Sequence, residues 1–94
     1  MLPEPIVYLA GAYFHQDYDL ESGTPVQVVE SFRRDESEER VDILRRAIEG
    51  VLAAGMSENE LAALWIDQAG ASYDPRDDGL EVSRWFLMVT EALA

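Results

Sequence analysis

Two helix-start signals, each followed by apolar residues at helical spacing, constrain the fold of this chain more than any other feature. Thr24-Pro25-Val26-Gln27 and Ser57-Glu58-Asn59-Glu60 each place a hydroxyl residue three positions before Gln or Glu. This is the capping-box arrangement, which satisfies the first free backbone N–H groups of a helix. Apolar residues then recur every three or four positions, the repeat of a helix with one buried side. The sequence therefore predicts an all-α fold.

The same apolar repeat predicts about five short helices and no convincing strand. With their caps, the predicted helices cover residues 4–14, 24–34, 37–54, 57–70 and 81–93. A chain of 94 residues is long enough for one domain with one modest core. We therefore expect a single domain, 1–94, built as a compact bundle with short connections between neighbouring helices.

Each predicted helix carries one apolar face, and we expect these faces to form the core. The inward-facing side chains are Ile6, Leu9, Ala10, Tyr13, Phe14, Val28, Val29, Phe32, Val41, Leu44, Ile48, Val51, Leu52, Leu61, Leu64, Trp65, Ala69, Val82, Trp85, Phe86, Val89 and Leu93. Leu87 and Met88 widen the apolar arc of the last helix. That helix is therefore either the central one or offers part of its surface for docking.

The charge of the chain is strongly acidic. Nineteen acidic residues stand against seven basic ones, all of them arginine, for a formal net charge of −12. Nucleic acid and anionic membranes repel such a surface, whereas a basic protein is attracted to it. The alternative is that the acidity serves solubility alone. Glu36 and Asp42 each precede an arginine by four residues, Arg40 and Arg46, and are expected to pair with it along the helix.

The sequence also limits the compartment and the chemistry. It contains no cysteine, which excludes disulfides and thiolate metal sites and suits a reducing cytoplasm. No stretch approaches the ~20 apolar residues of a membrane span. The N-terminus lacks the basic start of a signal peptide, so we expect a cytoplasmic protein.

Catalytic and metal-binding patterns are weak. The chain has one histidine, His15, and no nucleophile elbow, so a hydrolase triad is not expected. His15, Asp17 and Asp19 alternate in a way that permits a metal site, but a local hydrogen-bonded cluster is the stronger interpretation. The acidic stretch from Asp74 fails the calcium-loop pattern, because Arg76 and Trp85 occupy ligand positions. We therefore expect that the protein is not an enzyme and holds no cofactor and no metal. The remaining alternative is a small metal-dependent enzyme. Elemental analysis of the purified protein tests that alternative.

One string is more specific than composition. The octet Tyr13-Phe14-His15-Gln16-Asp17-Tyr18-Asp19-Leu20 is followed by Gly23-Thr24-Pro25 and later by Tyr73-Asp74-Pro75 and Asp78-Gly79-Leu80. This arrangement resembles a family of small immunity proteins of bacterial contact-dependent growth inhibition systems. The resemblance spans about Leu9 to Leu93. Other aromatic residues are common in the family where this chain has Tyr18, and a Ser or Thr cap is more typical where it has Glu81.

The resemblance implies a cytoplasmic protein that binds the toxic C-terminal domain of a delivered effector and blocks its active site or its substrate-binding surface. Many such toxins are nucleases with a basic substrate surface, which an acidic chain would complement. We expect a tight heterodimer with a cognate toxin and a monomeric free form. The alternative function is an acidic nucleic-acid mimic or adaptor that binds a host DNA-binding protein.

The predicted toxin-binding residues lie in the first and last loops. Acidic side chains there would meet the basic toxin, and Tyr or Arg would anchor the interface. These residues are Asp17, Tyr18, Asp19, Glu21, Tyr73, Asp74, Arg76, Asp77 and Asp78. Asp17 and Asp19 have a competing role, because aspartates in loops commonly bond their own backbone.

Overall fold

A computed structural model describes residues 3–15 and 23–94 of the chain. Regular structure in these two ranges is helical, which confirms the all-α prediction. The elements are α1 (Glu4–Tyr13), α3 (Pro25–Asp35), α4 (Glu38–Ala53), α5 (Glu58–Ala62), the π-helical η1 (Ala63–Gln68), the 3-10 turn η2 (Pro75–Asp78) and α6 (Val82–Leu93). None of the described helices is long and apolar enough to cross a membrane.

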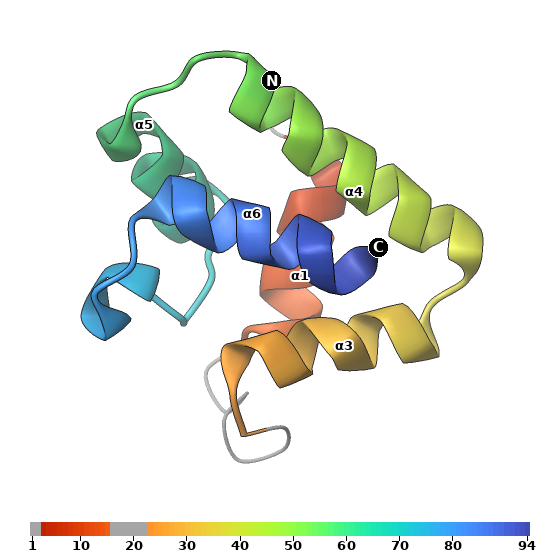
Figure 1. The fold of residues 1–94 in the computed structure, drawn as a ribbon. Coiled ribbons are helices and arrows are strands. Elements are labelled where there is room, and N and C mark those ends of the chain that lie inside the picture. The colour runs from red at the N-terminus through yellow and green to blue at the C-terminus, as the bar shows by residue number, and fades with distance from the viewer. Residues whose placement is uncertain (1–2, 16–22) are drawn as a thin grey trace.

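The helix α6 lies at the centre of the arrangement. In Figure 1 it crosses in front of α1 and runs between α3 and α4, and it contacts α3, α4 and α5. Trp85 and Phe86 are fully buried on one side of α6, whereas Leu87 is 44% exposed on the other. The last helix is therefore central, as one of the two sequence-based alternatives proposed, and it also shows an apolar residue to solvent.

Aromatic side chains form the middle of the core. Trp65 and Trp85 are fully buried, and their ring centroids lie 5.8 Å apart. Phe14 packs edge-on against both rings, at 5.4 and 5.5 Å. Every inward-facing residue predicted for the last helix is buried, as are Leu61, Leu64, Trp65 and Ala69 of the preceding one. Edge-to-face aromatic packing of this kind adds to the burial of the rings themselves.

The predicted caps are present, and one further cap comes from a different helix. Thr24 and Ser57 each accept a hydrogen bond at 3.2 Å from the backbone N–H three residues later. Glu81, at the start of α6, makes no side-chain cap bond. Instead the Glu58 carboxylate of α5 accepts from the backbone N–H of Ser83 at 3.1 Å and from its hydroxyl at 3.1 Å. A carboxylate at a helix N-terminus is stabilising, so α5 caps α6.

The predicted uniform helix over 57–70 is wrong in its second half. After Ala62 the turns widen into the π-helix η1, in which the Ala69 N–H bonds to the Leu64 carbonyl at 2.8 Å. The predicted loop over 71–79 likewise contains the 3-10 turn η2. Gly70 ends the fourth helix as expected, with a φ of 77° that an L side chain rarely adopts.

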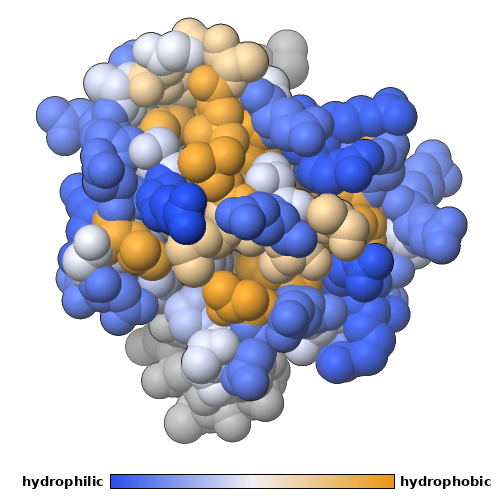
Figure 2. Space-filling view, viewed as in Figure 1, coloured by the Kyte–Doolittle hydropathy of each residue, from blue (hydrophilic) through white to orange (hydrophobic). Residues whose placement is uncertain are grey.

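The surface is mostly hydrophilic. Figure 2 shows the face that carries α6, where one larger hydrophobic patch lies toward the top of the view and smaller separate patches are scattered among hydrophilic residues. Scattered apolar exposure of this extent is normal for a folded chain and by itself marks no interface.

Candidate protein-binding site

The predicted residues of the first loop, Asp17, Tyr18, Asp19 and Glu21, lie outside the described residues. The two competing roles of Asp17 and Asp19 therefore stay predictions, and so does the expected cluster with His15. His15 itself is half-buried just after α1.

The last loop is anchored at its beginning. The Ser72 N–H donates to the Phe14 carbonyl at 2.8 Å, which ties the loop to the end of α1. The Trp65 indole N–H donates to the Tyr73 carbonyl at 2.8 Å. A loop with both of these bonds is held in one position on the aromatic core, so the acidic residues that follow it are presented on a fixed support.

Tyr73, a predicted interface anchor, is buried in the free chain, and its role in binding stays a prediction. Its side chain is only 6% exposed, and its ring lies 4.9 Å from that of Trp85. The Tyr73 hydroxyl donates to Asp78 Oδ2 at 2.9 Å. Because the Tyr73 ring packs in the aromatic core and its hydroxyl bonds to Asp78, Tyr73 helps to hold the loop in place.

Asp74 and Arg76 bind each other. The Arg76 guanidinium donates to both carboxylate oxygens of Asp74, at 2.9 Å from Nε and 2.8 Å from Nη2. Asp74 Oδ1 also accepts from the Arg76 backbone N–H at 3.0 Å and so caps η2. The hydrogen bond from Arg76 lowers the pKa of Asp74, and the same contact raises the pKa of Arg76. Arg76 thus neutralises Asp74, and the exposed carboxylates of Asp77 and Asp78 carry the remaining negative charge of the loop.

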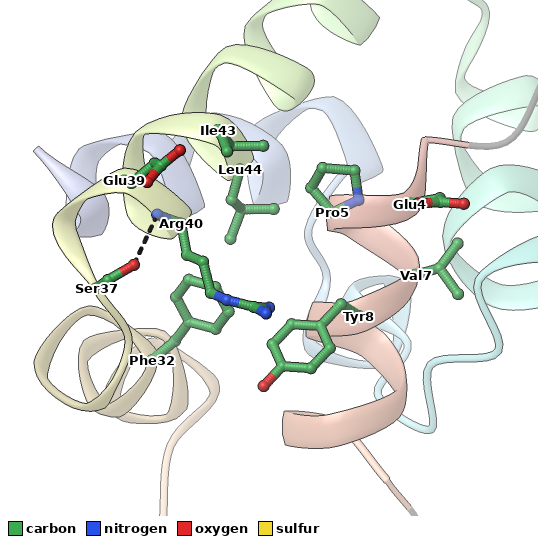
Figure 3. A pocket seen from close by; sticks show the side chains of 10 residues that line it. All are labelled: Glu4, Pro5, Val7, Tyr8, Phe32, Ser37, Glu39, Arg40, Ile43 and Leu44. Atoms are coloured by element: carbon green, nitrogen blue, oxygen red, sulfur yellow. Dashed lines mark hydrogen bonds between the residues drawn. The ribbon is translucent and has the colours of Figure 1, made fainter.

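A hollow of about 1050 Å³ lies between α1 and the corner that joins α3 to α4. The residues that line it are Glu4, Pro5, Val7, Tyr8, Phe32, Ser37, Glu39, Arg40, Ile43 and Leu44. Tyr8 and Ile43 are large hydrophobic residues that are nonetheless exposed, 41% and 45% respectively. Figure 3 shows that Arg40 reaches from α4 toward α1, with its guanidinium beside the Tyr8 ring. The hollow therefore combines an apolar lining with the charged side chains of Glu4, Glu39 and Arg40.

Glu36 connects the two sides of this hollow. Its carboxylate accepts from the Tyr8 hydroxyl at 3.0 Å and from the Tyr13 hydroxyl at 2.6 Å. The hydrogen bond to Glu36 raises the pKa of Tyr8, and burial together with Glu36 raises the pKa of Tyr13. Arg40 Nε lies 3.8 Å from Glu36, so the predicted pair is present, but Glu36 lies before the cap of α4 and the pair does not run along one helix. The Arg40 guanidinium carbon lies 5.1 Å from the Tyr8 ring centroid.

Comparison with known proteins decides the family. A family model described as CdiI immunity protein matches residues 4–93. The chain belongs to the CdiI immunity protein family. Its fold is similar to that of a chain in the crystal structure of the CdiA-CT/CdiI complex from Y. kristensenii 33638, with a TM-score of 0.92, 19% identity and 97% of each chain covered. No curated protein matches the chain.

The sequence prediction for this CdiI family member missed Tyr8. The sequence did contain a signal of its exposure, because Tyr8 lies off the apolar stripe of α1, which contains Ile6, Leu9 and Tyr13. An aromatic residue outside the buried stripe of a helix is expected to be exposed, and tyrosine is enriched among residues that dominate interfaces.

Across residues 3–15 and 23–94, no group of three or more His, Asp or Glu side chains is placed to hold a metal ion. The arrangement instead offers carboxylates, an aromatic face and a guanidinium on rigid helices, which are the side chains of a polar protein interface.

Proposed function

We propose that this CdiI family member is an immunity protein that binds and neutralises the C-terminal toxin domain of its cognate CdiA effector. The observation that carries the proposal is the family match over residues 4–93. The similar fold comes from a crystal structure of a CdiA-CT/CdiI complex, which supports a toxin domain as the partner. Inhibition by binding requires no catalysis by this chain.

The electrostatics favour a basic toxin, and a nuclease is the class that best fits them. A nuclease binds phosphates with cationic side chains, so its substrate surface is positive. This chain carries a net charge of −12, and its last loop presents Asp77 and Asp78 on a rigid support. Opposite charges accelerate encounter between proteins, and salt screens this attraction over about 8 Å at physiological ionic strength.

The test pairs this chain with the toxin domain encoded beside its gene. Co-expression should protect cells that otherwise die, and the purified proteins should form a one-to-one complex. Association should slow by about tenfold or more between low and high NaCl, while dissociation changes little. Cells that die despite full expression of this chain would reject the proposal.

A pair of matched variants tests whether the last loop contributes locally. Asp77→Asn with Asp78→Asn removes two charges from the loop, and Glu49→Gln with Glu91→Gln removes two exposed charges from α4 and α6. We expect the loop variant to slow association more than the helix variant, because steering depends on charges near the interface. Equal effects would assign the steering to net charge and exclude a special role for the loop.

A further inference from the structure

We propose that the hollow between α1 and the α3–α4 corner receives a guanidinium side chain of the toxin domain, and that Arg40 fills that place in the free protein. This inference rests on the proposed immunity function, and it names the chemistry of one contact. The occupant is an arginine of a basic partner.

The geometry of the hollow already binds a guanidinium. The Arg40 guanidinium carbon lies 5.1 Å from the centroid of the Tyr8 ring, within the range of a cation–π contact. Its Nε lies 3.8 Å from the Glu36 carboxylate. An aromatic face on α1 next to a carboxylate at the α3–α4 corner is a site that recognises a flat cation irrespective of which chain supplies it.

Arg40 is held loosely, whereas its acceptor is held firmly. The Arg40 side chain is 59% exposed and its ion pair with Glu36 is long, so the pair contributes little. Glu36 is only 14% exposed, and two tyrosine hydroxyls fix its carboxylate. A partner arginine can therefore displace Arg40 without disturbing Tyr8, Tyr13 or Glu36.

The surroundings favour a cation from a second protein. Phe32 and Leu44 are buried against the hollow and Ile43 is exposed beside it, which gives apolar surface for the stem of an arginine. Glu4 and Glu39, also on the lining, are exposed, and neither forms an ion pair within the described residues. Tyr and Arg are enriched among the residues that dominate interface energies.

The decisive experiment measures the Kd of the purified toxin domain for variants of this chain. Arg40→Ala removes the competing guanidinium and should tighten binding by about two- to fivefold, the range expected for one exposed cation–π contact. Tyr8→Phe keeps the aromatic face but loses the hydroxyl that holds Glu36, so it should weaken binding less than Tyr8→Leu. Tyr8→Leu loses both the face and the hydroxyl and should weaken binding by about fivefold or more.

Leu87→Ala is the control, because Leu87 is an exposed apolar residue on α6 that does not line the hollow. It should leave Kd unchanged, and a thermal melt of each variant confirms folding. Unchanged or weaker binding by Arg40→Ala, or equal binding by the Tyr8→Phe and Tyr8→Leu variants, overturns this inference while the immunity function stands. Failure of the unmodified chain to bind overturns both.

Discussion

At the scale of single residues, Glu36 makes contacts that the neighbouring sequence does not predict. Its proximity to Arg40 was expected from the four-residue spacing, although Glu36 lies in extended backbone just before the cap of α4 and so outside that helix. Its bonds to Tyr8 and Tyr13 join residues 28 and 23 positions apart. These bonds depend on how α1 packs against the α3–α4 corner, and no spacing rule within a helix predicts that packing.

The raised pKa of Tyr13 leads to a test at high pH. Burial and the bond to Glu36 favour the neutral phenol, so Tyr13 ionises later in the folded chain than at the usual pKa of about 10. This contribution to stability is complete below the unfolded pKa and is lost as pH rises through the folded one. Above about pH 10 the unmodified chain should therefore lose stability more steeply than Tyr13→Phe.

The measurement combines urea unfolding with tyrosinate absorbance as pH rises. The chain has no lysine and no cysteine, so tyrosines are the side chains that titrate near pH 10, and no other group interferes with the measurement. Tyr13→Phe should remove a late-ionising component from the absorbance curve. Loss of an early-ionising component instead would show that the pKa of Tyr13 is not raised.

At the scale of elements, the sequence predicted what depends on neighbours in the chain. The caps at Thr24 and Ser57 involve partners three residues away, so the pattern itself contains them. The Glu58 cap of α6 joins residues 25 apart and was missed. The π-helical widening of η1 was also missed, because the apolar spacing of 61–69 fits a regular helix equally well.

The end of the fourth helix gives a prediction with a matched control. Gly70 has a φ of 77°, and no neighbouring atom lies within 4 Å of the place that an alanine methyl would take, so Gly70→Ala tests backbone strain without a clash. It should destabilise the fold by about 1–2 kcal/mol. Gly50→Ala, within α4 and equally open, should instead stabilise it by up to ~1 kcal/mol. Urea unfolding measures both, and the same sign for the two would contradict the assigned backbone conformations.

At the scale of the whole molecule, the fold class and core were predictable, whereas the binding surface stays a prediction. Apolar spacing identifies which side chains leave water, and Trp65, Trp85 and Phe86 are buried as predicted. An interface is made of residues that stay exposed after packing, which depends on the tertiary arrangement. Tyr73 and Tyr8 illustrate this, because the sequence does not show that Tyr73, the predicted anchor, is buried in the free chain while Tyr8 stays 41% exposed.

The net charge of −12 predicts opposite effects of salt on folding and on partner binding. Self-repulsion among the carboxylates opposes the compact state, and salt screens it, so the melting temperature of the free chain should rise with NaCl. A gain of about 1 kcal/mol corresponds to roughly 4–8 °C for a domain of this size. Association with a basic toxin should slow over the same range, because salt screens that attraction as well.

A variant with four neutralised carboxylates separates this effect from general effects of salt on proteins. Combining Asp77→Asn, Asp78→Asn, Glu49→Gln and Glu91→Gln changes the net charge from −12 to −8, since each substitution removes one negative charge. Its melting temperature should be higher at low salt and should rise less with NaCl, because less repulsion remains to be screened. An equal rise in both proteins would mean that salt acts through burial of apolar surface. The acidity would then serve encounter with the partner alone, at no cost to the stability of the fold.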